Sequence, residues 1–278
     1  MSNDIEDRPI DDQRLTIGER LNTPAGQLVK KVTLVIVVMT VILVIFSVWW
    51  VNESMPVVAS DTEQAVQDTM MVFAVASAPV MALVWGIGYY SLRHWRSPNK
   101  DLSLPPEDGP PIRSNARLTM TWVIVSGILT AFLLVWGLTE LTATTTIPTT
   151  SSPLVVKVTG QQWLWSFAYD NDGGVGSPDL VLPIDRTIVF QVTSTDVIHS
   201  FWLPEMGVKV DANPGVMTTS ITTPSKLGTF NVRCAELCGL NHSFMETTVT
   251  VVSADDFNKW ITAHGGTPGQ KVAGGTNG

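Results

Sequence analysis

The sequence predicts a membrane-anchored all-β protein, in which N-terminal transmembrane helices are followed by a β-sandwich. Two observations support this fold class. The first half of the 278-residue chain contains three long apolar stretches. The second half contains short alternating runs of Val, Thr and Ile separated by Gly, Pro and Asp, which is the pattern of half-buried strands.

The apolar stretches are long enough to cross a bilayer, because a helix needs roughly 20 residues to span a hydrocarbon core of about 30 Å. They lie at 32–51, 70–92 and 118–141, within an anchor over 32–141 that follows an N-terminal tail over 1–31. Tryptophans such as Trp49 and Trp50 lie near their ends, where indole rings favour the headgroup layer. We therefore predict three membrane helices in contact with lipid.

Basic residues predict the orientation of the anchor. The segment 52–69 contains no Lys or Arg, whereas the next loop contains Arg93, Arg96, Lys100, Arg113 and Arg117. Because Lys and Arg are retained in the cytoplasm, the N-terminus is predicted inside and everything after Leu141 outside the cell membrane. The alternative for the first stretch is a cleaved signal peptide, with Val57-Val58-Ala59 as a cleavage site, although 32–51 is longer than the usual apolar core of a signal.

The outer domain is predicted over 153–264, after a linker at 142–152 that is rich in Thr, Ser and Pro. Strands are predicted at 154–158, 187–193, 217–222, 229–233 and 247–252, and their spacing favours an antiparallel sandwich. A short helix over 255–263 follows, with Ser253 as its cap and Trp260 packing back on the sheet. The Gly-rich tail over 265–278 is predicted to be disordered.

Composition excludes some classes of function. The net charge of -8 argues against a nucleic-acid partner. The chain has no Cys-x-x-Cys-His motif, so it carries no covalently attached c-type haem.

The two cysteines of the chain lie in one motif, Cys234-Ala-Glu-Leu-Cys238-Gly-Leu-Asn-His242-Ser-Phe-Met245. A disulfide would suit an oxidising compartment but leaves the nearby His and Met unexplained. Zinc held by the two cysteines, His199 and His242 gives Met245 no role, and a mononuclear blue-copper site leaves one Cys unexplained. A dinuclear copper centre uses every member, because two thiolates can bridge two copper ions.

Three motifs closely resemble subunit II of haem-copper cytochrome c oxidases: Asp196-Val-Ile-His199-Ser, Lys209-Val-Asp211-Ala-Asn-Pro-Gly215, and the cysteine motif above. Gly160-Gln-Gln-Trp163-Leu-Trp165 extends the resemblance over the outer domain. The resemblance implies a cupredoxin-like Greek-key sandwich with a binuclear copper A centre. It also implies that single electrons pass from cytochrome c, or a similar small redox protein, to haem in subunit I, where oxygen is reduced to water with proton translocation. Subunit III is a further expected partner.

Carried over by residue, the resemblance makes His199 and His242 the terminal copper ligands and Cys234 and Cys238 the bridging thiolates. Met245 would be the weak axial ligand, and Glu236 would bind through its backbone carbonyl. The Glu236 side chain would also reach a magnesium ion shared with subunit I.

The same resemblance makes Trp163 the residue at which electrons arrive, and Asp196 and Asp211 acids that help to dock the donor. Asp170, Asp172, Asp179 and Asp185 could extend an acidic face that steers a basic cytochrome.

The sequence also departs from the family. Thr119 stands where many members have a glutamate for proton uptake, and Leu164 and Ala168 replace a tyrosine and an acid near Trp163. Many members have two membrane helices rather than three. The alternative function from another class is a membrane adaptor stabilised by zinc or a disulfide. A quinol oxidase subunit is disfavoured because that group lacks the copper ligands, and the copper domain of nitrous oxide reductase because that enzyme needs a large additional domain.

Overall fold

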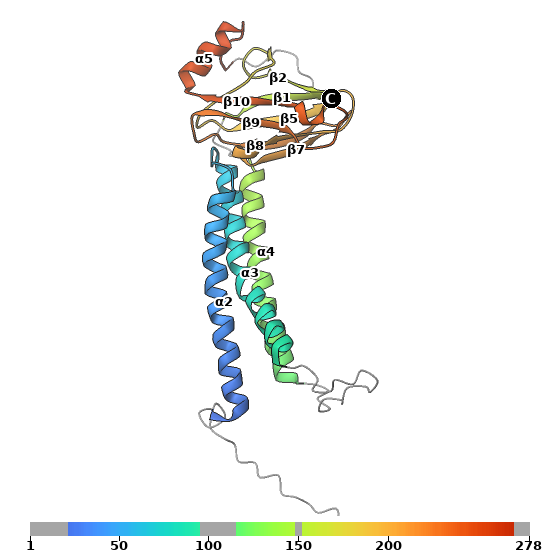
Figure 1. Ribbon diagram of the computed structural model, residues 1–278. Coiled ribbons are helices and arrows are strands. Elements are labelled where there is room, and N and C mark those ends of the chain that lie inside the picture. The colour runs from blue at the N-terminus through green and yellow to red at the C-terminus, as the bar shows by residue number, and fades with distance from the viewer. Residues whose placement is uncertain (1–21, 95–114, 148–151, 270–278) are drawn as a thin grey trace, which may run out of the picture. The chain divides into compact units, whose positions relative to one another are not determined.

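The computed structural model describes residues 22–94, 115–147 and 152–269. Among these residues, three helices are long and apolar enough to cross a membrane, with mean hydropathies of 2.9, 2.1 and 2.2. They are α2 (Pro24–Ser54), α3 (Asp61–His94) and α4 (Ala116–Thr145) (Figure 1). The prediction of three long apolar helices is confirmed. Each extends beyond the predicted apolar stretch, because a helix continues into polar turns that hydropathy does not detect.

The described residues form two compact units. One comprises α2 up to Trp49 together with α3 from Ala74, and in it Gly86 lies directly against the Ile36 side chain. The other comprises the segment Trp50–Phe73, α4 and the β-domain. The candidate site lies entirely in the second unit.

The segment after α4 and the start of the C-terminal tail differ from the expected boundaries. Helix α4 continues to Thr145, where the Thr142 and Thr145 hydroxyls donate to carbonyls one turn earlier, so the predicted linker over 142–152 begins as helix. Residues 265–269 were expected to be disordered, yet the Gly269 N–H donates to the buried carboxylate of Asp172. The remaining parts of the predicted tail, loop and linker, over 1–21, 95–114, 148–151 and 270–278, lie outside the described residues.

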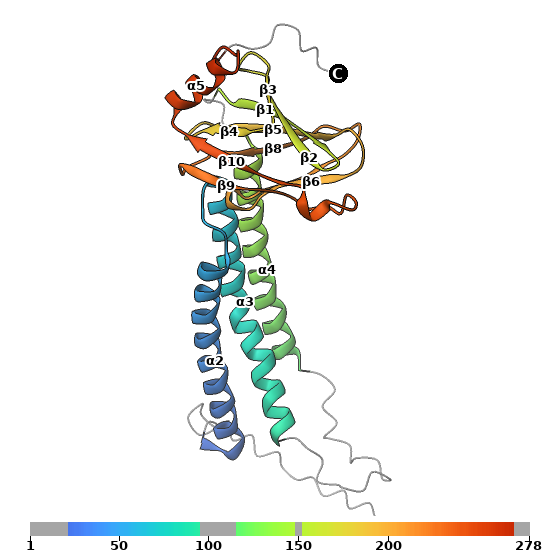
Figure 2. The ribbon, with the colours of Figure 1, turned by 45° about the horizontal axis from the view of Figure 1, so that its top comes forward.

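The β-domain is a sandwich of two five-stranded sheets in the described part of the chain (Figure 2). The first sheet has the order β3-β2-β1-β5-β8 and the second β4-β10-β9-β6-β7. The strands are β1 (Leu154–Gln161), β2 (Leu164–Tyr169), β3 (Val175–Ser177), β4 (Leu180–Pro183), β5 (Ile188–Ser194), β6 (His199–Leu203), β7 (Val208–Ala212), β8 (Thr218–Thr222), β9 (Gly228–Cys234) and β10 (Glu246–Val252).

Two strand pairs are parallel, so the expectation of a wholly antiparallel sandwich is wrong. Strand β1 pairs in parallel with β5, and β4 pairs in parallel with β10. Alternation along one strand reports which face is buried but not the direction of its neighbour, so the sequence could not reveal these pairs. The cupredoxin-like class of the sandwich, with its long crossovers between sheets, is confirmed.

The core lies between the sheets and follows the predicted alternation. In β1, Leu154, Val156 and Val158 are buried, and the residues between them are not. Helix α5 (Ala254–Ala263) is confirmed as well: the Ser253 hydroxyl accepts the Asp256 N–H at 3.2 Å, and the Trp260 ring lies 5.2 Å from that of Tyr169. Burial raises the pKa of Tyr169, whose hydroxyl bonds to the Val181 backbone.

Strand pairing brings four loops to the same end of the sandwich. Gly160 is paired with Ser194, His199 with Ala212, and Cys234 with Phe201. The loops that leave these strand ends are 161–164, 194–199, 212–218 and 234–246. We call this end of the domain the cysteine end.

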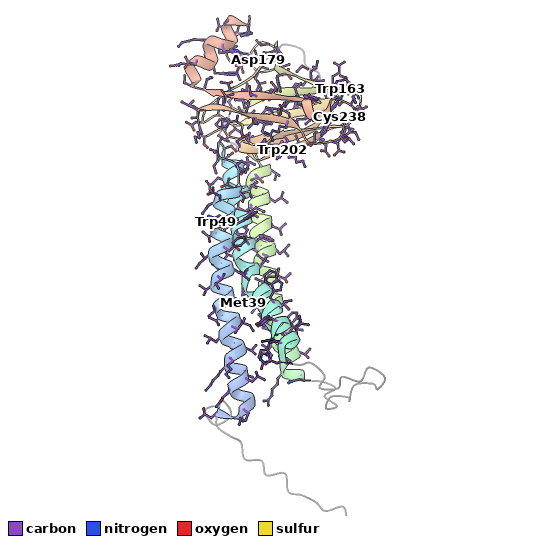
Figure 3. The ribbon with its side chains drawn as sticks, in the orientation of Figure 1. Met39, Trp49, Trp163, Asp179, Trp202 and Cys238 are labelled. Carbon is purple, nitrogen blue, oxygen red and sulfur yellow. The ribbon has the colours of Figure 1, made fainter. Side chains whose placement is uncertain are left out.

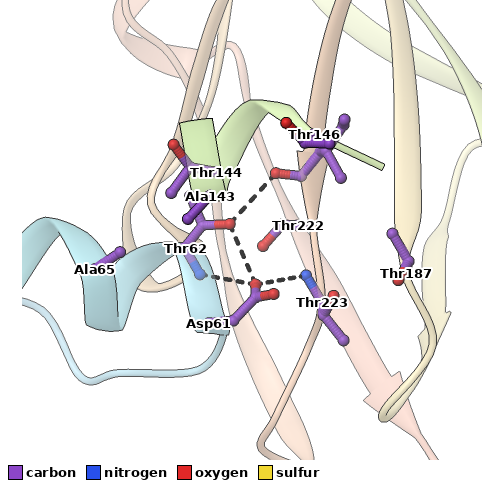
Figure 4. A pocket seen from close by; sticks show the side chains of 10 residues that line it. Asp61, Thr62, Ala65, Ala143, Thr144, Thr146, Thr187, Thr222 and Thr223 are labelled. Atoms are coloured by element: carbon purple, nitrogen blue, oxygen red, sulfur yellow. Dashed lines mark hydrogen bonds between the residues drawn. The ribbon is translucent and has the colours of Figure 1, made fainter. Parts of the chain in front are cut away.

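The opposite end of the sandwich contacts the segment that precedes α3. The Ser60 hydroxyl donates to the Met206 carbonyl at 2.9 Å and accepts the Glu63 N–H at 3.1 Å. Asp61 accepts the Thr223 N–H at 2.7 Å beside a small pocket lined largely by threonines, which Figure 4 shows. The start of α3 is therefore tied to the β-domain by hydrogen bonds between the Ser60 and Asp61 side chains and backbone groups of the sandwich.

Candidate metal centre

The two cysteines converge because β9 ends at Cys234 and the chain turns back over the end of the sandwich. Their sulfur atoms lie 3.8 Å apart. A disulfide bond is about 2.05 Å long, so these are two free thiols. Together with a nitrogen of His199 they form a group whose ligand atoms all lie within 4.8 Å of one another, which could hold a metal ion.

His199 begins β6 and is completely buried. Its Nδ1 faces the Cys234 sulfur at 3.8 Å, while Nε2 lies 2.9 Å from Oδ1 of Asp196. A carboxylate on the far nitrogen fixes the ring and its tautomer, which is the usual support for a metal-binding histidine. Gly160 lies beneath the ring: a Cβ there would come within 3.1 Å of it.

The remaining predicted ligands lie around the same two sulfurs. His242 Nδ1 is 3.5 Å and the buried Met245 sulfur 3.7 Å from the Cys238 sulfur. The Glu236 carbonyl oxygen is 3.3 Å from the Cys234 sulfur. Each sulfur therefore has its own imidazole and one further weak donor, so the donor set is divided into two halves.

The electrostatics of the site favour a neutral Cys238 thiol before a metal binds. Burial, and then the neighbouring Cys234, raise the pKa of Cys238 to about 11. Since a thiolate is the metal ligand, a bound metal must displace this proton.

Gln162 connects the β1–β2 turn to both halves of the site. Its side-chain amide donates to the Cys238 carbonyl at 2.7 Å, and its backbone N–H donates to Asp196 at 2.8 Å. The half-buried Trp163 follows, and its indole packs on Gly239, where a Cβ would lie 3.4 Å from the ring. In Figure 3, Trp163 and Cys238 are labelled close together at the cysteine end. The sequence indicated Trp163 but not Gln162 or Gly239, although each directly adjoins a residue that it did indicate.

Comparison with known proteins agrees with the metal-binding geometry of the outer domain. The family described as "Cytochrome C oxidase subunit II, periplasmic domain" matches residues 174–252, which include His199 and the whole cysteine motif. The chain belongs to the cytochrome c oxidase subunit II family. The residues that form the metal-binding group are thus part of the segment shared with that family.

Among its relatives, cytochrome c oxidase subunit 2 of Alkalihalophilus pseudofirmus is 29% identical over 71% of this chain and 58% of its own length. The probable subunit 2 of Rickettsia bellii is 31% identical over 54% of this chain and 62% of its own. The chain thus spans about three fifths of these two relatives. The periplasmic domain of subunit II from Bradyrhizobium japonicum is 34% identical, covers 43% of this chain and 97% of that domain, and has a TM-score of 0.41.

Other residues named in the comparison with the subunit II family lie apart from the metal group. Asp211 is exposed on β7, and its backbone carbonyl, not its carboxylate, binds Thr218. Thr119 is exposed on α4, in the helical anchor. Trp165 is buried against Phe201 in the core.

Asp196, which is expected to help dock the donor, is exposed at the cysteine end, and its oxygens also make hydrogen bonds within the domain. They accept the N–H groups of Gln162 and Val197 and contact His199 and the Ser194 hydroxyl. Although partial burial opposes the effect, the hydrogen bond from Gln162 and then that from His199 lower the pKa of Asp196 to about 2. Its carboxylate therefore organises the site, and its contact with a partner stays a prediction.

Proposed function

We propose that this chain relays single electrons in a respiratory haem-copper oxidase, through a binuclear copper A centre on its outer domain. Cys234 and Cys238 would bridge the two copper ions, His199 and His242 would be the terminal ligands, and Met245 and the Glu236 carbonyl would complete the shells. Bound there, the copper pair supplies a one-electron carrier. The observation that carries this proposal is the division of one donor set between two sulfurs 3.8 Å apart.

The chain's own residues would keep the movement of the copper ligands small during each electron transfer. Asp196 holds one imidazole, and the ligands sit on strand ends of a packed sandwich. Soft sulfur donors suit copper, and a fixed surrounding shell tunes its potential. The buried Met245 sulfur distinguishes this reading from zinc, because a thioether has no role in a tetrahedral zinc site.

Trp163 is the residue at which we propose that electrons arrive. Its indole touches Gly239, which follows the ligand Cys238, and Gln162 connects the same turn to the Cys238 carbonyl. A donor that covers Trp163 would therefore contact a side chain that packs on Gly239, the residue next to the bridging thiolate Cys238. The donor would be cytochrome c or a similar small redox protein.

The other proposed partners follow from the same family. Subunit I would receive the electrons at haem for the reduction of oxygen and proton translocation, and subunit III would complete the complex. The exposed Glu236 side chain would reach a magnesium ion shared with subunit I, since a carboxylate is a suitable ligand for that ion. The absence of basic residues at 52–69 and their abundance around 93–117 support an extracytoplasmic outer domain on the cell membrane.

Metal content and electron paramagnetic resonance of the purified full chain test this proposal. We expect two coppers per chain sharing one unpaired electron, and loss of that signal in Cys234→Ser. Met245→Leu should keep both coppers but change the hyperfine pattern, whereas Met217→Leu, at an exposed methionine outside the donor set, should change nothing. A colourless chain with one zinc would instead indicate a non-redox adaptor, and a stable Cys234–Cys238 disulfide would have the same meaning.

A further inference from the structure

Helices α2 and α3 share one compact unit, and the seam between them is partly hollow. They touch at Gly86, where a Cβ would lie 2.8 Å from the Ile36 side chain. Next to this contact lie a cavity of about 580 Å³, which Gly86 itself lines, and a cavity of about 720 Å³. Val35 and Tyr89 line both cavities, so the two form one continuous groove, which we call the α2–α3 groove.

The α2–α3 groove has an apolar part and a basic end. The apolar part is lined by Met39, Val84 and Trp85, and Figure 3 labels Met39 on α2. The basic end is lined by Lys31, near the start of α2, and by His94, at the end of α3. An occupant that fits both parts is therefore apolar along most of its length and polar at one end.

The charges at the basic end have a single sign. The described residues of this unit, at 22–49 and 74–94, contain no Asp or Glu. Their basic residues are Lys30, Lys31, Arg93 and His94. The His94 ring stacks on Tyr90 with the ring centroids 4.1 Å apart, and both side chains line the groove. The basic end therefore complements a negatively charged group.

The length of the groove matches one leaflet of a bilayer. Lys31 and Met39 are eight residues apart, which is about 12 Å along a helix, and Val84 and His94 are ten residues apart, which is about 15 Å. Half of a hydrocarbon core of about 30 Å is about 15 Å. Because Lys31 and His94 lie just outside the predicted apolar stretches, the groove runs from the polar surface to about the middle of the membrane.

We propose that the α2–α3 groove binds one anionic phospholipid. Its phosphate would lie at Lys31 and His94, and an acyl chain would lie along Met39, Val84 and Trp85. Basic pockets between transmembrane helices attract anionic headgroups, and the proposed orientation of the chain makes this the cytoplasmic leaflet. The groove requires α2, the first of three helices in a family in which many members have two. It also belongs to a different unit from the proposed copper ligands, so the lipid site does not depend on the proposed function.

Native mass spectrometry of the purified full chain tests the proposal. The chain is mixed with equal amounts of phosphatidylglycerol and phosphatidylcholine that have the same acyl chains. We expect one tightly bound phosphatidylglycerol per chain, held about five-fold or more tightly than phosphatidylcholine, because one Lys near an anionic headgroup contributes about that factor. Equal retention of the two lipids would overturn the proposal, and so would a chain mass showing that α2 had been removed.

Lys31→Gln tests the basic end of the groove. It should lower the affinity for phosphatidylglycerol about five-fold and leave that for phosphatidylcholine unchanged. Lys30→Gln is the matched control, because Lys30 is the adjacent exposed lysine but does not line the groove. Equal losses in both variants would show a general attraction of this end of the anchor for anionic lipid and would overturn a defined site.

Gly88→Leu tests the apolar part of the groove. Gly88 lines that part, and a Cβ there would meet nothing within 4 Å, so a leucine fills the space without displacing backbone. It should weaken the binding of phosphatidylglycerol ten-fold or more. Gly127→Leu on α4, where the Cβ position is equally open, is the control and should change nothing.

Two further measurements distinguish other occupants. Glycerol 1-phosphate carries the phosphate without acyl chains and should not displace the lipid even in large excess, whereas displacement would assign the basic end to a soluble phosphate and overturn the proposal. Gly88→Leu should still co-purify with the other oxidase subunits. A variant that keeps its lipid but no longer co-purifies would place a protein in the groove and would also overturn the proposal.

Discussion

At the scale of single residues, the site depends on small groups that hold the ligands. Asp196 connects to His199, and Gln162 connects to both Asp196 and the Cys238 carbonyl. Glycines at 160 and 239 leave room for the His199 and Trp163 rings. The ligands are therefore positioned by neighbours that are not among the proposed copper ligands.

Gln162→Met tests this positioning, because it keeps the size of the side chain but removes the donor to the Cys238 carbonyl. We expect a loss of about 1 kcal/mol in stability and a thermal transition lower by about 4 °C. The copper signal should shift while two coppers remain bound. Gln161→Met, at the exposed neighbouring glutamine, is the control, and equal effects of both variants would contradict a positioning role.

At the scale of elements, the start of α3 is joined to the β-domain with almost no spare space. Gly207 has a φ of +61°, and a Cβ there would lie 2.8 Å from the Glu63 backbone nitrogen. Ser60, which is fully buried, binds both Met206 and Glu63 across the same contact. Glycine is required at position 207 because the Glu63 backbone approaches it closely and because its φ is positive.

Gly207→Ala should therefore destabilise the chain more than Gly215→Ala. Both glycines have a positive φ, and a left-handed alanine costs about 1–2 kcal/mol at either position. An alanine Cβ at position 215 would find open space. At position 207 it must displace the Glu63 backbone, which adds about 1–3 kcal/mol to the destabilisation. Thermal unfolding of the full chain in detergent should show at least twice the loss for Gly207→Ala. Equal losses would mean that the contact with α3 contributes no stability.

At the scale of the whole molecule, the metal ligands come from strands and loops far apart in sequence. His199 begins β6, Cys234 ends β9, and Met245 precedes β10. A bound metal joins these elements only when the sandwich is folded. Metal binding and folding of the outer domain should therefore be coupled.

Removing copper with a chelator should lower the unfolding temperature of the full chain. Free copper at about 1,000 times its Kd stabilises the folded state by about 4 kcal/mol. His199→Ala should abolish this copper-dependent shift, whereas His264→Ala, at an exposed histidine beyond α5, should retain it. An identical shift in both variants would place copper at some other site.

The sequence by itself determined the three apolar helices, the positions of β1, β5, β8, β9 and β10, and the residue types of the metal centre. These follow from local periodicity and from the chemistry of one compact motif, Cys234 to Met245. The strand β2 and the short β3, β4, β6 and β7 were missed, because short or continuous apolar runs have no clear period.

The tertiary structure alone decided which residues meet. It paired β1 with β5 in parallel, brought the His199 loop to the cysteines, and turned Asp196 inward to a histidine. It also placed Asp170 and Asp172 at the far end of the sandwich from Trp163. Sequence patterns describe neighbours along the chain, whereas contacts between loops depend on strand order and direction, which are determined only when the two sheets pack.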